Sequence, residues 1–337
     1  NTTDYLNKYL TKYNLSASNF SQTIFETNLL TVLDHNLKYK AGQTSYTKDL
    51  NHFAGTDVRE KSRHLKFSKL PLNMHKSNEN YREYKPRRLD TKMNLEYHSN
   101  FDWRDYGFKT VVRDQGECGS CWAITVAGAL ESRDAWYRGE STELSTQELV
   151  DCSSKDFGCE GGWFDTAFQY IADKTNKWLM PDRIYPYTGR KQQCRLNSPH
   201  TYDDEQHCTS YGCSNGNSNR ITGPLKCVGS ERIPPNEEVL KEALVHHGPV
   251  AVALHVTQNL YLYSNGIFVD DSCNSNNLNH AVLLLGYGRD ERTGLDYWII
   301  KNSWGKTWGE EGYFRIQKGL NMCGIAAYAV KPIVDYS

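Results

Sequence analysis

Apolar residues recur at helical spacing near the start of the chain. They are Ile24, Phe25, Leu29, Val32, Leu33 and Leu37. This spacing predicts an amphipathic helix that ends before Ala41-Gly42. Residues 71–95, which contain Pro71, Pro86 and Arg87-Arg88, show no such period. They indicate an extended basic linker, the kind of exposed segment that proteases nick.

Further helices are predicted between residues 120 and 175. The stretch from Trp122 to Leu130 is apolar with few helix breakers, which predicts a buried helix with Cys121 at its N-terminus. Ser145-Thr146-Gln147-Glu148 matches a capping box that starts a second helix. A third helix is predicted by the stripe of Phe164, Ala167, Phe168 and Ile171.

Beyond residue 249 the apolar runs are short and typical of strands. One strand is predicted around Leu278-Asn279-His280-Ala281-Val282, and another begins at Tyr297 and ends in Asn302-Ser303-Trp304-Gly305. The longest apolar run, Ala281 to Leu285, is far shorter than the ~20 residues that cross a bilayer. We therefore expect no membrane span.

Charge divides the chain into two parts. The 337 residues carry 39 Lys+Arg against 40 Asp+Glu, which gives no support for a nucleic-acid or polybasic membrane binder. Residues 1–96 hold 16 basic and 10 acidic residues, a balance of +6, and residues 97–337 hold 23 and 30, a balance of −7. This asymmetry suits a basic unit that docks on an acidic body, and chance variation between two solvated surfaces is the alternative.

The cysteines indicate an oxidising compartment. The chain has ten cysteines, more than cytosolic proteins usually keep, and all ten lie between Cys118 and Cys323. The front of the chain holds glycosylation sequons that start at Asn1, Asn14 and Asn19. Both features predict a secreted or endolysosomal protein.

Cys121 is the candidate nucleophile. At a helix N-terminus the dipole favours the thiolate, which is the reactive form of cysteine. Gln115 lies six residues upstream and its amide could be one donor of an oxyanion hole, with the backbone N–H of Cys121 as the other.

His280 and Asn302 could complete the chemistry. A Cys, a His and an Asn far apart in sequence can meet as nucleophile, base and orienter. Singly, each has a common structural reading: a disulfide cysteine, a surface histidine, an Asn-Ser turn. The ordered set is what indicates an enzyme.

The chain closely resembles the papain family of cysteine proteases, in particular its cathepsin-L-like branch. The resemblance extends over roughly residues 97–335, and its motifs occur in family order. They are Asp102-Trp103-Arg104, the block from Gln115 to Trp122, Gln147 to Cys152, Gly158 to Gly162, Tyr185-Pro186-Tyr187, Gly248-Pro249-Val250, Asn279 to Val282, Asn302 to Gly305 and Asn321 to Gly324.

The resemblance implies an α+β, papain-like two-domain fold. Residues 97–232 would form a helical left domain with the Cys nucleophile, and residues 233–337 a β-barrel-like right domain with His280 and Asn302. Residues 1–96 would form a mainly helical inhibitory propeptide, with the mature enzyme beginning between Leu95 and Asn100. No cofactor is implied, and we expect a monomer that acts on protein or peptide substrates.

The resemblance also assigns roles to residues. Cys121 is the nucleophile, His280 the general acid/base, Asn302 its orienter and Gln115 an oxyanion donor, while Trp304 shields the His–Asn pair. The substrate-binding set is Gly161, Gly162, Trp163, Phe164, Ala253, Leu278, Asn279, Ala281, Tyr328 and Trp304.

Specificity depends on Tyr328, which stands where the family usually has a small residue. We expect a shallower pocket with a hydroxyl at its base, still favouring apolar or aromatic side chains at the second residue before the scissile bond. No occluding insertion follows Gly161-Gly162, which predicts an open cleft and endopeptidase activity.

The family pattern implies disulfides Cys118–Cys159, Cys152–Cys194 and Cys273–Cys323. Three cysteines are left over: Cys208, Cys213 and Cys227. We expect one extra disulfide and a free thiol among them. The alternatives are an intermolecular disulfide, or a zinc site that also uses His200 or His207.

The front end resembles the family's inhibitory propeptide more loosely. Phe25, Asn28, Val32 and Asn36 keep the spacing of its helix motif, and Asn51 and Phe53 match a second motif. At four positions the expected residues are replaced, by Ala17, Ser21, Asp49 and Gly55. We expect an inhibitory segment without the family's buried ion pairs, loosened when acid protonates carboxylates of the acidic body.

Two other functions stay open on the sequence. A peptide ligase would share the acyl-enzyme and differ in excluding water. An inert binding or storage protein could use the same fold, although the intact set of Cys121, Gln115, His280 and Asn302 argues against it.

Overall fold

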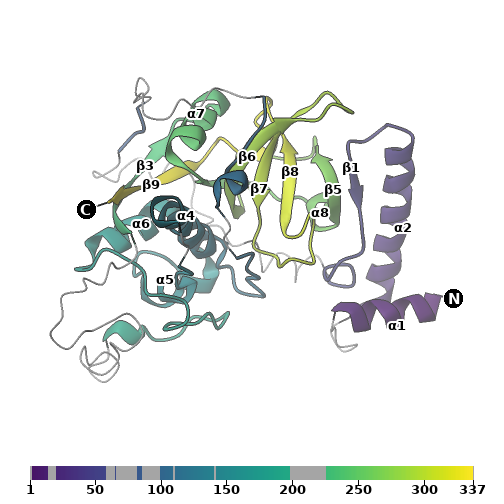
Figure 1. Ribbon diagram of the computed structural model, residues 1–337. Coiled ribbons are helices and arrows are strands. Elements are labelled where there is room, and N and C mark those ends of the chain that lie inside the picture. Colours follow the sequence, from purple (N-terminus) through teal and green to yellow (C-terminus); the bar gives the residue numbers. More distant parts are fainter. Residues whose placement is uncertain are drawn as a thin grey trace.

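The structure is a computed structural model that describes residues 2–13, 20–57, 65, 82–85, 99–108, 111–139, 142–197 and 225–336. The N-terminal unit contains helices α1 (Thr2–Tyr13) and α2 (Gln22–Lys40) and strand β1 (Tyr46–Lys48). Figure 1 shows this unit standing at one side of the body, reached through β1.

The body combines helices with one large sheet. Its helices are α4 (Cys121–Arg138), α5 (Thr146–Cys152), α6 (Phe164–Asp173), α7 (Glu237–His247) and α8 (Gln258–Tyr261), with 3-10 turns η4 (Trp103–Tyr106), η5 (Gly158–Glu160), η6 (Arg195–Asn197) and η8 (Met322–Gly324). Its strands are β2 (Phe101–Asp102), β3 (Lys226–Ile233), β4 (Val250–Leu254), β5 (Tyr263–Phe268), β6 (His280–Arg289), β7 (Asp296–Lys301), β8 (Tyr313–Gln317) and β9 (Ala329–Asp335).

The sheet runs in the order β1-β5-β8-β7-β6-β4-β9-β3, and β2 pairs with β6. Its pairings are antiparallel except for β5 with β8. β1 and β3 are the two ends, so the expected barrel-like arrangement is an open sheet. The expected domain boundary at residue 232 falls inside β3.

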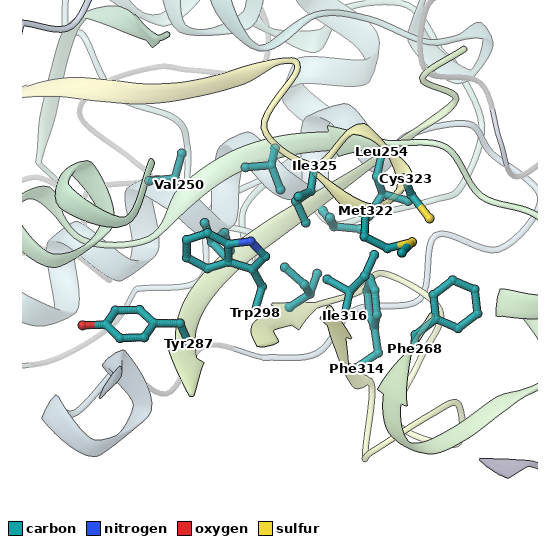
Figure 2. Packing of buried hydrophobic residues seen from close by; sticks show 14 of the residues in the cluster. Val250, Leu254, Phe268, Tyr287, Trp298, Phe314, Ile316, Met322, Cys323 and Ile325 are labelled. Atoms are coloured by element: carbon teal, nitrogen blue, oxygen red, sulfur yellow. The ribbon is translucent and has the colours of Figure 1, made fainter. Parts of the chain in front are cut away.

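Two hydrophobic cores lie in the body. One packs against the sheet around Trp298, Phe314 and Ile316, and Figure 2 shows these side chains converging with Val250 and Ile325. The other surrounds α4 and α6 and includes Cys121 and Tyr328. None of the helices within the described ranges is long and apolar enough to cross a membrane.

The predicted helices are confirmed, with two differences. In α2, Phe25 and Val32 are buried, but Leu33 and Leu37 are 53% and 65% exposed, so the buried stripe is narrower than predicted. At α5, Ser145 Oγ accepts a hydrogen bond from the Glu148 N–H at 2.9 Å as a capping residue should. The Glu148 carboxylate instead binds Lys174 and accepts from the Met180 N–H at 2.7 Å.

Candidate active site

Cys121 is the first residue of α4, and the turn before it is fixed by a disulfide. Cys118 is bonded to Cys159, and the Gly119 N–H donates to the Cys159 carbonyl at 2.9 Å. The Ser120 hydroxyl lies 2.5 Å from the Tyr187 hydroxyl. These bonds place the cysteine at the helix N-terminus, as the sequence predicts.

The thiol of Cys121 differs from expectation in its acidity. The residue is fully buried, and burial raises the pKa of the thiol to about 12 because a thiolate would lose its hydration. Backbone hydrogen bonds from Ala281, Trp122 and Cys121 itself act in the opposite direction. The N–H groups at the start of α4 therefore act in the predicted direction, but burial outweighs them in the chain with its N-terminal unit in place.

Gln115 lies beside this turn and is fixed at both ends of its amide. Its Nε2 donates to the Cys118 carbonyl at 2.9 Å, and its Oε1 accepts from the Ser303 hydroxyl at 2.7 Å. The Gln115 N–H also donates to the Ser303 carbonyl at 2.9 Å. The residue therefore ties the segment before α4 to the segment after β7.

His280 and Asn302 come from neighbouring strands of the sheet. His280 opens β6, and Asn302 follows the last residue of β7, which pairs with β6. The Nε2 of His280 is 2.8 Å from the Oδ1 of Asn302, and both residues are buried. The imidazole stacks on the Trp304 ring with centroids 4.9 Å apart. The structure thus places Trp304 over the pair, where the sequence predicted a shield.

The sulfur of Cys121 meets the start of β6. The hydrogen bond from the Ala281 backbone reaches the thiol, and Ala281 directly follows His280. Cys121 and Ala281 also belong to the same buried cluster. The predicted nucleophile, base and orienter therefore come together, although they lie on a helix and two strands.

An aromatic cluster covers this pair from the side of the N-terminal unit. Tyr261 stacks on Trp304 with centroids 5.1 Å apart, and Trp308 meets it edge-on at 4.9 Å. Phe53, from the N-terminal unit, packs edge-on against the same Trp304 at 5.2 Å. The unit therefore touches the residue that covers His280.

The two glycines predicted to bind substrate backbone occupy restricted positions. Gly161 has φ 116°, a conformation that side chains disfavour. A Cβ on Gly162 would lie 2.5 Å from the Trp122 ring. Both positions therefore require glycine, which leaves the main chain of this strip without side chains over it.

The predicted pocket residues are brought together. Trp163, Phe164, Ala253, Leu278, Ala281 and Tyr328 all belong to the buried cluster that contains Cys121. Tyr328 stacks on Phe164 with centroids 5.2 Å apart and meets Trp163 edge-on at 5.4 Å.

The hydroxyl of Tyr328 has a different setting from the one expected. It is hydrogen-bonded to Asp165, whose carboxylate pairs with Arg232 at 2.8 Å, and the guanidinium lies 4.9 Å from the Tyr328 ring centroid. Burial, followed by the nearby charge of Asp165, raises the pKa of Tyr328 well above its ordinary value, so the group is a neutral donor. The expected hydroxyl of the pocket base is therefore bound to a carboxylate.

Asp165 and Arg232 were not found by sequence reasoning. They are 67 positions apart and lie in different elements, α6 and β3, so no local motif joins them. Asn279, by contrast, was predicted to bind substrate, and its side chain bonds to the Val256 backbone at 2.7 and 3.2 Å. Its contribution to a substrate site would come from its main chain.

The three family disulfides are confirmed. Cys118–Cys159, Cys152–Cys194 and Cys273–Cys323 are all bonded. Cys227 is a free, buried thiol 3.4 Å from the Gly229 carbonyl. Cys208 and Cys213, His200 and His207, and the sequon residues Asn1, Asn14 and Asn19 lie outside the described residues. Within the described ranges, no group of three or more His, Cys, Asp or Glu could hold a metal ion.

Comparison with known proteins gives one consistent answer. Residues 97–333 match the papain family cysteine protease domain, and residues 3–60 match the cathepsin propeptide inhibitor domain. A cathepsin L-like protein of Caenorhabditis elegans is 35% identical over 321 residues, covering 92% of this chain and 84% of that protein. Cathepsin K of Mus musculus is 33% identical over 329 residues, covering 95% and 89%.

A solved structure supports the same assignment. The digestive procathepsin L2 proteinase from Tenebrio molitor larval midgut superimposes with a TM-score of 0.82 at 33% identity, covering 98% of this chain and 99% of that one. The chain therefore belongs to the papain family of cysteine proteases, as a cathepsin-L-like zymogen with its propeptide inhibitor domain. The predicted fold class and enzyme class are confirmed.

Proposed function

We propose that this chain is the zymogen of an endopeptidase in which Cys121 attacks the substrate carbonyl and His280 moves the protons. Because Nε2 of His280 bonds to an acceptor oxygen, Nε2 carries a hydrogen and Nδ1 exchanges a proton with the thiol. The thiol proton passes to His280 as the C–S bond forms, then to the leaving amine as the C–N bond breaks. Water hydrolyses the thioester and restores the thiol.

The oxyanion of this reaction would be held by Gln115 and the start of α4. One N–H of the Gln115 amide donates to Cys118, and an amide nitrogen has a second to offer. The first N–H groups of a helix lack partners within it, so the Cys121 N–H suits the same role. Losing one such donor typically costs about 2.7–4 kcal/mol of transition-state stabilisation.

The observation that carries the proposal is the buried His280–Asn302 hydrogen bond beside the Cys121 sulfur. A buried polar pair covered by Trp304 contributes no more to folding than an apolar pair of the same shape could. Its arrangement is the one that general acid–base catalysis needs.

The test uses the two free cysteines of the described residues. Acid-activated wild type should cleave a peptide library and react with a thiol-directed epoxide. Cys121→Ala should lose both properties, whereas Cys227→Ser, which removes the other free thiol, should keep both. Loss of labelling in Cys227→Ser alone would contradict the assignment, and joined rather than shortened peptides would favour a ligase.

The pocket is proposed to accept apolar or aromatic side chains at the second residue before the scissile bond. The Tyr328 ring lies at its base and stacks on Phe164, and the Tyr328 hydroxyl is hydrogen-bonded to Asp165. Tyr328→Ala should deepen the pocket and raise kcat/KM for bulky side chains relative to small ones. Tyr328→Phe, which keeps the ring, is the control, and a basic preference in wild type would refute the proposal.

The N-terminal unit is proposed to inhibit by binding beside the active site and to release in acid. β1 adds to β5, and the Asn51 amide donates to the Tyr261 carbonyl at 2.7 Å. Near this junction His35 is half-buried, and its Nε2 lies 3.0 Å from the Tyr46 carbonyl. The other titratable and charged groups that face this region are Asp34, Lys38, Tyr46, Lys48, His255 and Asp270.

His35 is the group whose titration fits release at mildly acid pH. Burial, and then the charge of Lys48, lower its pKa below the ordinary 6.5. The packing of α2 against β1 within the unit is therefore fully stabilised above about pH 6.5 and loses stability as the pH falls through the lower folded pKa of His35, which would loosen the strand that docks on β5. Burial alone would raise the pKa of Asp270, but hydrogen bonds from Ser272, Thr257 and Asn259 lower it. Asp270 therefore titrates only in stronger acid than an ordinary carboxyl, so it is not the group at this junction that responds first to mild acid.

Processing and location follow from the same proposal. Asn100 Oδ1 already accepts from the Arg289 N–H at 2.8 Å, and Phe101 pairs with Tyr287, so the body is anchored from about residue 100 onward. This supports a mature N-terminus between Leu95 and Asn100. The three disulfides and the digestive relative support a lysosomal, endosomal or secreted enzyme.

A further inference from the structure

The N-terminal segment touches both ends of the body's sheet. At one end β1 pairs with β5. At the other end, Glu83 forms a parallel bridge with Arg232 of β3, the last strand of the order. Figure 1 shows β1 and β3 on opposite sides of the molecule. Residues 82–85 lie outside the matched inhibitor domain, which covers residues 3–60.

The contact at β3 has the geometry of strand addition. The Tyr84 N–H donates to the Arg232 carbonyl at 2.8 Å, and the Arg232 N–H donates to the Arg82 carbonyl at 2.9 Å. The named strand that β3 pairs with is β9, on its other side. An edge strand offers a row of backbone donors and acceptors on which an extended peptide can bind.

One side chain anchors this segment. Tyr84 is 3% exposed, whereas Arg82, Glu83 and Lys85 on either side are exposed. Its ring meets the His247 ring edge-on at 5.4 Å, and the Lys331 ammonium lies 5.5 Å from its centroid. Its hydroxyl donates to Glu242 at 3.5 Å. The slot is thus formed by α7 and β9 beside the β3 edge.

We infer that the outer edge of β3, with the slot for Tyr84, is a second peptide-binding surface of the protease body. Its occupant is residues 82–85 of the propeptide, residues 1–96, which we call the prosegment. The inference rests on the proposed function in that the prosegment inhibits. Two contacts joined by one chain hold far more tightly than either alone, because the second forms within the molecule. A cut between residues 57 and 82 would convert one bivalent ligand into two weaker ones.

The first test compares uncleaved zymogens at neutral pH by the rate at which a thiol-directed epoxide labels Cys121. Tyr84→Ala should label about 30-fold faster, the effect of losing a buried tyrosine anchor from an interface. Glu83→Ala, an exposed neighbour on the same strand, should match wild type. Tyr84→Phe should stay within about 3-fold, because the hydrogen bond from the Tyr84 hydroxyl to Glu242 is long and the ring is kept. Equal rates for Tyr84→Ala and wild type would overturn the inference.

The variants share a built-in control. Residue 84 precedes the proposed mature N-terminus, so wild type and Tyr84→Ala should yield chemically identical mature enzymes with the same kcat/KM. A difference in the labelling rate of Cys121 therefore reports how tightly the prosegment is held in the zymogen. If neither mature enzyme cleaves peptides, the proposed function fails, and the exchange experiment below still decides this inference.

The second test measures amide hydrogen exchange in the Cys121→Ala zymogen. Arg232 should be protected, and adding Tyr84→Ala should speed its exchange at least about tenfold. The Ile267 amide, which donates to the Ser45 carbonyl at 3.0 Å at the β1 end, should exchange faster by a smaller factor, because the β1 contact remains but loses its tethered partner. An equal loss of protection at the two amides and at amides of the body core would overturn the inference, since Tyr84 would then support the zymogen as a whole.

Discussion

The active site and the prosegment interface are held by different kinds of bond. In the active site, side chains from distant segments bind one another, as Gln115 does with Ser303 and His280 with Asn302. At the interface most bonds involve main chain. The Asn51 amide donates to the Tyr261 carbonyl at 2.7 Å, and the Ser45 hydroxyl donates to the Ile267 carbonyl at 2.6 Å. The part that stays is specified by side chains, and the part that must leave is held by groups common to every residue.

Main-chain bonds also hold the N-terminal unit together at positions where it departs from the family pattern. Ser21 caps α2 by accepting from the Ile24 N–H, and its own N–H donates to the Gly55 carbonyl at 3.0 Å. A Cβ on Gly55 would lie 2.1 Å from the Phe20 ring. An aromatic contact and a backbone bond thus lie at Gly55, one of the four positions where the residue expected from the family is replaced.

The largest expected effect is in the active site. Gln115→Ala should lower kcat/KM of the mature enzyme by about 100- to 1,000-fold, mostly through kcat, because an oxyanion donor is lost. Ser303→Ala, which removes only the bond to Oε1, should cost less than about tenfold. Steady-state kinetics on one peptide measures both. Equal losses would mean that orientation by Ser303, and not donation by the amide, dominates.

The main-chain contacts of the prosegment interface can be tested by adding a methyl group where two backbones lie close together. A Cβ on Gly266 would meet the Ser45 carbonyl oxygen at 2.5 Å, so Gly266→Ala should weaken β1 docking and speed epoxide labelling of the zymogen about tenfold or more. Gly319 has nearly the same φ, +102° against +101°, with nothing near its Cβ position. Gly319→Ala carries the same strain and should leave labelling unchanged.

Stability of the body should depend on Asp156. This buried residue accepts hydrogen bonds from Ser153, Trp163 and Thr166, but burial raises its pKa to about 6. A raised carboxyl pKa gives stability that is complete below about pH 4 and is lost as the pH rises through 6. Denaturant unfolding of wild type should therefore lose on the order of 2 kcal/mol between pH 4 and 7 from this group. Asp156→Asn should remove that difference, and an unchanged pH profile would contradict it.

The smallest effect concerns His35. His35→Gln keeps a donor for the Tyr46 carbonyl but cannot gain charge, so prosegment release should require a pH lower by a few tenths of a unit. Processing followed by gel electrophoresis from pH 4 to 7 measures the midpoint. Asp34→Asn, an exposed neighbour on α2, should leave that midpoint closer to wild type. A midpoint unmoved by His35→Gln would assign acid release to other groups.

The sequence predicted what depends on local order. The helix begun by Cys121, the strand that His280 opens and the strand before Asn302 follow from periodicity. The three family disulfides follow from the resemblance to the papain family. Sequence-based prediction failed for properties that depend on contacts between distant segments of the chain. The pKa of Cys121 depends on burial created by many segments, and the partner of the Tyr328 hydroxyl lies in another part of the chain.

Arg232 belongs to both regions at once. Its backbone holds residues 82 and 84, while its guanidinium holds the carboxylate that binds the Tyr328 hydroxyl. Any residue except proline would keep these backbone bonds, so a substitution of Arg232 would remove only side-chain contacts such as the ion pair with Asp165. Evolution could therefore alter substrate preference at this position while leaving inhibition by the precursor's own N-terminal segment unchanged.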